Sequence, residues 1–155
     1  MQIFFPKEKE FETRVSILPE TVKKLVELGI NVEVEASFGK KVHLSDDSYA
    51  ISGASISKDR NSSLSSSDVT CRINKPKKEE IQILKKNSTH ISFLDPFNES
   101  ELVKEFINSN ITAISMELIP RITRAQKMDA LSSQANLGGY VAVIEASRCL
   151  GKSFP

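Results

Sequence analysis

Short apolar runs alternate with amphipathic stretches along most of the chain. Residues 30–35 (INVEVE) alternate strictly between apolar and polar side chains, which is typical of a half-buried strand. Residues 19–29 instead carry apolar side chains at helical spacing. Pro19 favours the first turn of a helix, and Gly29 favours its end. The two segments therefore predict a helix followed directly by a strand.

The same reasoning predicts five strands, at residues 2–5, 30–35, 68–73, 90–94 and 111–115. Helical stretches lie between most of them, and the serine-rich segment 62–67 (SSLSSS) is predicted to be a short polar link. After Pro120 the pattern is helical, with interruptions, as far as Gly151. Strands that alternate with helices pair in parallel through right-handed crossovers. The predicted fold class is α/β, a doubly wound, mainly parallel five-stranded sheet of the flavodoxin-like or Rossmann-like type, spanning residues 1–150.

Composition narrows the functional classes. The chain has 155 residues, 21 basic and 20 acidic, with a net charge of +1, so we expect no nucleic-acid partner. Cys71 and Cys149 are far apart and have no metal-ligand spacing, and we expect no metal site. No apolar run is long enough to span a bilayer.

Glycine placement excludes one kind of cofactor site. The six glycines never form GxGxxG after a strand, so the turn that cradles a dinucleotide pyrophosphate is absent from this sequence. Ligands of open α/β sheets lie beyond the carboxyl ends of the strands. The segments to inspect are therefore those directly after strands, residues 6–14, 74–78, 95–98 and 120–133, and candidate side chains stand out in the first and the last of them.

Arg14 is the first candidate in these segments. It lies in the loop that leaves the first strand, where a guanidinium could bind a small carboxylic acid through two parallel hydrogen bonds. The alternative is a structural ion pair with Glu12 or Glu8, and the spacing favours this alternative.

Residues 119–140 (IPRITRAQKMDALSSQANLGGY) contain the second group of candidates. Polar side chains supply both donors and acceptors there, at Arg121, Arg124, Gln126, Asp129 and Ser132. In a helix, the last three of these would lie on one side, three residues apart. Such a row could bind a carboxamide or a ribose, but it could equally be a solvated helix face.

These two stretches resemble a known family. The segment PKEKEFETRVSILPETVKKLVELG resembles the N-terminal signature shared by alanine dehydrogenase and the transhydrogenase α subunit. The segment PRITRAQKMDALSSQANLGGY resembles the loop and helix of the NAD(H)-binding component of proton-translocating NAD(P) transhydrogenase. Its RxxxxQxxD pattern is lacking in alanine dehydrogenase. The resemblance extends over nearly the whole chain and implies the first α/β lobe of that component.

The resemblance implies hydride transfer between NAD(H), held by this component, and NADP(H), held by a partner component. A membrane-spanning partner would couple the transfer to proton movement, and the complete component would be a homodimer at the cytoplasmic face of the inner membrane. The chain alone is expected to be inactive. The implied cofactor-binding residues are Arg121, Ile122, Thr123, Arg124, Gln126, Asp129 and Ser132, with Gln126 the candidate for a catalytic role. We expect Gln126 and Asp129 to be accessible.

Several positions depart from the family pattern. Phe5 replaces a usual glycine, Asn74 replaces the substrate lysine of alanine dehydrogenase, and Asp95 lies near the position of its catalytic histidine. Asn74 and Asp95 disfavour an amino-acid dehydrogenase. Arg14 is retained, so a site for a small acid stays an alternative. The alternatives are an alanine dehydrogenase-like lobe and a non-catalytic module. Residues 151–155 are expected to begin a link to an NAD-binding lobe that this chain lacks.

Overall fold

The computed structural model describes residues 1–152. Its packing divides the chain into two compact units, residues 1–115 and a second unit that begins at Met116. The predicted link at 151–155 lies mostly outside the described residues.

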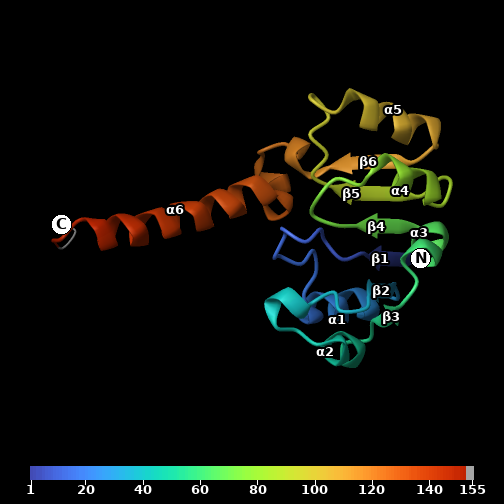
Figure 1. The fold of residues 1–155 in the computed structure, drawn as a ribbon, viewed down its shortest axis with the longest axis horizontal. Coiled ribbons are helices and arrows are strands. Elements are labelled where there is room, and N and C mark those ends of the chain that lie inside the picture. The colour runs from blue at the N-terminus through green and yellow to red at the C-terminus, as the bar shows by residue number, and fades with distance from the viewer. Residues whose placement is uncertain (153–155) are drawn as a thin grey trace. The chain divides into compact units, whose positions relative to one another are not determined.

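A six-stranded parallel sheet forms the centre of the first unit (Figure 1). Its strand order is β3-β2-β1-β4-β5-β6, so the chain reverses its direction of winding at β1 and β4. All five predicted strands are present, and the parallel doubly wound class is confirmed. The strands are β1 Gln2–Phe5, β2 Asn31–Glu35, β3 Ser55–Ser57, β4 Val69–Cys71, β5 Thr89–Ser92 and β6 Thr112–Ser115.

The sheet has one strand more than the five predicted. The additional strand is β3, which pairs only with β2 at the edge of the sheet. Its three residues are Ser-Ile-Ser, too few to show the alternation of a longer strand. Strand β3 exists because its backbone completes hydrogen bonds that β2 would otherwise leave open.

Five helices connect the strands in this unit: α1 Pro19–Glu27, α2 Asp46–Ile51, α3 Arg60–Ser66, α4 Lys78–Ile83 and α5 Ser100–Asn108, with a short 3₁₀ turn η1 at Lys40–Val42. The prediction of a polar link at 62–67 is wrong, because α3 covers most of it. Asp59 caps the helix by accepting from the Ser62 amide, and Leu64 is 1% exposed. The serine hydroxyls also donate to carbonyls one turn back, as Ser66 Oγ does to Ser62 O at 2.9 Å. The Asp59 cap and the buried Leu64 hold a helix that serine-rich composition disfavours.

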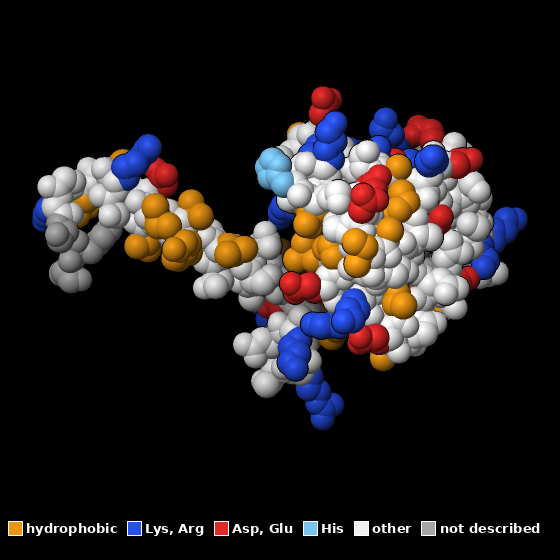
Figure 2. Space-filling model, turned by 90° about the horizontal axis from the view of Figure 1, so that it is seen from below, with side chains coloured by type: hydrophobic (Ala, Val, Ile, Leu, Met, Phe, Trp, Pro, Cys, Tyr) orange, Lys and Arg blue, Asp and Glu red, His pale blue; other side chains and the backbone are white. Residues whose placement is uncertain are grey.

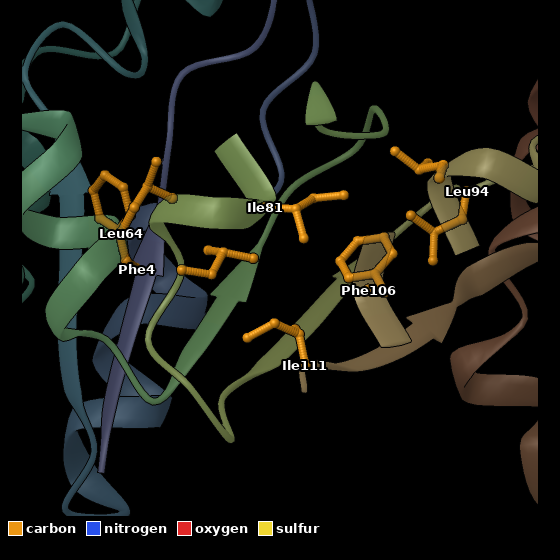
Figure 3. Packing of buried hydrophobic residues seen from close by; sticks show 8 residues of the cluster. Phe4, Leu64, Ile81, Leu94, Phe106 and Ile111 are labelled. Atoms are coloured by element: carbon orange, nitrogen blue, oxygen red, sulfur yellow. The ribbon is translucent and has the colours of Figure 1, made fainter. Parts of the chain in front are cut away.

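Both faces of the sheet are covered. Phe4 and Phe5 are neighbours on β1 and point to opposite faces, where they join separate apolar clusters. Phe4 packs with residues from α3, α4 and α5, including Leu64, Ile81 and Phe106 (Figure 3). Phe5 packs with residues that include Val22 of α1 and Tyr49 of α2. The crossovers on either side of β1 therefore cover different faces of the sheet.

Buried polar side chains interrupt this core between β4 and β5. Thr70 and His90 are partners in the parallel register, and each is 1% exposed. His90 Nε2 lies 3.2 Å from Ser92 Oγ, and its ring packs against Phe106. Its Nδ1 and the Thr70 hydroxyl have no hydrogen-bond partner within the described part of the chain. Burial lowers the pKa of His90 to about 3, and the nearby positive charge of Arg72 adds to the effect.

The second unit contains two 3₁₀ helices, η2 Met116–Leu118 and η3 Thr123–Met128, and the long helix α6 Ala130–Cys149. This agrees with the interrupted helical pattern predicted after Pro120. Helix α6 buries no side chain, and Figure 2 shows apolar side chains gathered along it. The large exposed ones are Leu137, Tyr140, Val141, Val143 and Ile144. Over residues 1–152, no helix has the length and apolarity needed to cross a membrane.

Acid should destabilise the first unit through His90. The unfolded chain binds a proton near pH 6.5, whereas the folded pKa is about 3, so stability is full above pH 6.5 and falls as the pH drops below it. At pH 5 this loss should be about 2 kcal/mol relative to pH 7.5. Urea unfolding at both pH values measures it. In His90→Asn most of the loss between these two pH values should disappear, and an unchanged loss would contradict the assignment to His90.

Candidate functional site

Arg14 is engaged in an ion pair within its own loop. Its Nε and Nη2 donate to the two carboxylate oxygens of Glu12, each at 2.8 Å, and its backbone amide donates to Oε1 at 3.0 Å. The hydrogen bond from the Arg14 side chain is the main reason that the pKa of Glu12 falls to about 2. Glu12 is 8% exposed. The structure therefore shows the ion pair that the spacing favours.

Glu8 joins the loop after β1 to the loop after β4. Its carboxylate accepts from the Ile73 amide at 2.5 Å, from the Asn74 amide at 3.2 Å and from Asn74 Nδ2 at 3.0 Å. Asn74 Nδ2 also donates to Glu12 at 3.2 Å. The neutral amide of Asn74 thus lies between two carboxylates and links both loops at the carboxyl edge of the sheet.

Lys41 fixes the middle of the loop that follows β1. Its ammonium donates to three backbone carbonyls, those of Lys9, Glu10 and Glu12, at 2.9, 2.7 and 2.9 Å. The three donors of one ammonium group are therefore all used. Nothing in the sequence signals this role, because the partners are main-chain atoms about thirty positions away.

The candidate residues of the second unit come together around one pocket of about 270 Å³. It is lined by Arg121, Ile122, Thr123, Gln126, Asp129 and Ser132. Six of the seven cofactor-binding candidates therefore line this pocket, and Arg124 does not. Gln126 is exposed, as expected, and so are Arg121 and Ser132. The residues meet because a 3₁₀ helix and the start of α6 place them around the same bend, although they do not form one continuous helical row.

Asp129 is the reason that the row is broken. Its ψ of 89° ends the 3₁₀ helix, and it becomes the N-cap of α6. Its carboxylate accepts from the Ser132 amide at 3.0 Å and from Ser132 Oγ at 2.5 Å. The hydrogen bond from the Ser132 hydroxyl holds the pKa of Asp129 below its usual range, and the positive charge of Arg121 acts in the same direction. Asp129 is 8% exposed, so the expectation that it is accessible is wrong.

The described residues, 1–152, contain no group of three or more histidine, cysteine or acidic side chains that could hold a metal ion.

Residues 4–138 match the family model described as alanine dehydrogenase/PNT, N-terminal domain. The chain belongs to this family. It is 38% identical, over 99% of its length, to NAD(P) transhydrogenase subunit alpha of Haemophilus influenzae, and it spans 30% of that protein. Alanine dehydrogenase 1 of Staphylococcus aureus is 32% identical over 85% of the chain, which spans 36% of that relative.

Two solved structures are also similar to this chain. The transhydrogenase of Sinorhizobium meliloti superposes with a TM-score of 0.88 at 38% identity, over 96% of this chain and 44% of that one. An L-alanine dehydrogenase superposes with a TM-score of 0.72 at 27% identity, over 77% of this chain and 33% of that one. The chain thus spans less than half the length of each of these relatives.

Loss of the Glu8 carboxylate should destabilise the first unit. Glu8→Ala leaves the Ile73 and Asn74 amides without their acceptor, and hydrogen bonds to charged groups contribute about 1.5–3 kcal/mol each. We expect a loss of about 2–3 kcal/mol in the free energy of unfolding, measured by urea denaturation. Glu10→Ala, in the same loop, is the matched control and should change it by less than about 0.5 kcal/mol. Equal effects of the two substitutions would contradict the role of Glu8.

Proposed function

We propose that this chain is the first lobe of the NAD(H)-binding component of a proton-translocating NAD(P) transhydrogenase. The observation that carries the proposal is the pocket lined by Arg121, Gln126 and their neighbours. Similarity supports it, since the chain is 38% identical to a transhydrogenase subunit and 32% identical to an alanine dehydrogenase.

The pocket suits the nicotinamide end of a dinucleotide. Sites for drug-sized ligands have volumes of about 300–1,000 Å³, so a pocket of 270 Å³ accommodates only part of such a molecule. A carboxamide needs one acceptor and one donor, and the exposed amide of Gln126 offers both. The guanidinium of Arg121 adds further donors, and Ile122 and Thr123 complete the wall.

Asp129 and Ser132 have a different role in this proposal. Their side chains bind each other at the start of α6 and so fix the bend that carries Gln126. They position the pocket, and the hydroxyl oxygen of Ser132 keeps lone pairs that can accept a further hydrogen bond.

Bound nicotinamide supplies the hydride chemistry, and the residues of the chain bind and orient it. A direct hydride step needs no general acid or base, which agrees with a pocket of Arg, Gln, Asp and Ser. Gln126 is then the catalytic candidate, because it would contact the carboxamide of the reacting ring. The NADP(H)-binding and membrane-spanning components would be partners, with a homodimer of the complete component held at the cytoplasmic face of the inner membrane.

An alanine dehydrogenase-like function has less support from the site. The Nε and Nη2 atoms of Arg14 both donate to Glu12. The side-chain amide of Asn74 lies between the carboxylates of Glu8 and Glu12. A substrate carboxylate placed there would meet two negative side chains and an amide in place of the substrate lysine. A non-catalytic module would bind transhydrogenase partners without supporting hydride transfer.

Gln126→Asn in the complete component should slow hydride transfer by about tenfold or more while weakening NADH binding by less than about threefold. The shorter side chain withdraws its amide from the reacting ring, whereas most binding contacts survive. Single-turnover kinetics and NADH titration measure the two effects. Lys127→Gln, exposed on the same 3₁₀ helix and outside the pocket, is the matched control. Equal losses in rate and affinity would contradict an orienting role.

The 155-residue chain by itself should bind NADH poorly and show no transhydrogenase activity. It lacks a glycine-rich turn for the pyrophosphate, and the pocket contacts only one end of the cofactor. A few hydrogen bonds of about 0.5–1.5 kcal/mol each do not offset the ~4–15 kcal/mol cost of immobilising a ligand. Calorimetry measures the affinity. A dissociation constant in the low micromolar range would contradict this account.

A further inference from the structure

A second pocket lies in the first unit, at the point where the strand order reverses. It has a volume of about 390 Å³ and lies among the loops that follow β1 and β4. In open α/β sheets this switch point, at the carboxyl ends of the strands, is where ligands bind. Its cationic lining side chains are Lys7, Lys9, Arg60, Arg72, Lys75 and Lys77.

The arginines of this pocket are held in fixed positions. Arg60 donates to Glu35 at 2.6 Å and to Glu80 at 2.7 Å, and Arg72 donates to Glu80 at 2.8 Å. Burial alone would raise the pKa of Glu80, but the hydrogen bonds and charges of Arg72 and Arg60 hold it well below its usual range. Arg72 is only 6% exposed, and its Nε has no partner among the described residues.

Positive charge exceeds negative charge around the pocket. Six cationic side chains line it with three carboxylates, and the Glu8 carboxylate is already bound to backbone amides. Lys75 pairs with Glu99 at 2.5 Å. Lys9 and Lys77 are exposed and have no carboxylate partner among residues 1–152. The pocket therefore contains two ammonium groups that are free to bind an anion.

We propose that this pocket binds a phosphate-bearing small molecule, with Lys9 and Lys77 as the main contacts to the phosphate. A phosphate carries up to two charges and accepts hydrogen bonds from several directions, which suits separate ammonium groups beside fixed guanidinium groups. A single carboxylate would balance only one of the two free charges. The volume leaves room for more than a lone phosphate. The inference does not depend on the proposed hydride-transfer function.

The test is a titration of the full chain, labelled with ¹⁵N, with pyrophosphate as the probe and succinate as the control anion. Ionic strength is held constant, because salt screens exposed charges. Pyrophosphate should shift the amide signals of Glu8, Asn74 and Lys75 saturably. The double variant Lys9→Ala/Lys77→Ala should weaken binding by about tenfold or more. Lys23→Ala/Lys86→Ala removes the same charge outside the pocket and should leave the affinity unchanged.

A parallel titration with NADH distinguishes two sources of phosphate. The weak NADH binding expected of this chain alone predicts no displacement, which supports a ligand other than NADH. Displacement of pyrophosphate by NADH would place a nucleotide phosphate in this pocket and would contradict that weak binding. The proposal is overturned if pyrophosphate causes no saturable shift, if the two double variants bind equally, or if succinate binds as tightly as pyrophosphate. The single variants Lys9→Ala and Lys77→Ala serve if the double variant does not fold.

Discussion

Strand β1 lies between β2 and β4, and the loops that leave β1 and β4 meet where the sheet changes its direction of winding. The carboxylate of Glu8 holds these loops together by accepting from the backbone of Ile73 and Asn74. The ion pair of Glu12 with Arg14 and the ammonium of Lys41 then fix the rest of the β1 loop. The carboxyl edge of the first unit is thus organised by charged side chains, several of which bind backbone atoms.

In the second unit, a single helix cap fixes the position of the pocket residues. Asp129 ends the 3₁₀ helix and begins α6, and its bonds to Ser132 fix the bend between the two. This bend brings Arg121 and Gln126 to the same pocket. Asp129, a cofactor-binding candidate in the sequence, lines the pocket and also caps α6, while Gln126 stays accessible.

Much of the fold could be predicted because short apolar runs alternate with amphipathic helical stretches, and residues 30–35 also alternate strictly. Strand β3 and helix α3 could not be predicted. Strand β3 is too short to show a period, and α3 depends on the Asp59 cap and a single buried leucine within a serine-rich segment. The grouping of Arg121, Gln126 and Ser132 could be predicted, because all three come after the fifth predicted strand. The burial of Asp129 could not be predicted, because it depends on where the 3₁₀ helix ends.

The central claim is that the Arg121–Ser132 pocket holds the nicotinamide ring. Methyl-labelled Ile122 and Thr123 line this pocket and can report on it directly. In a component completed by its second lobe and saturated with NADH, nuclear Overhauser effects should connect these methyl groups with the nicotinamide protons. Nuclear Overhauser effects from these methyl groups to the adenine protons alone, or to no proton of the bound cofactor, would contradict the account.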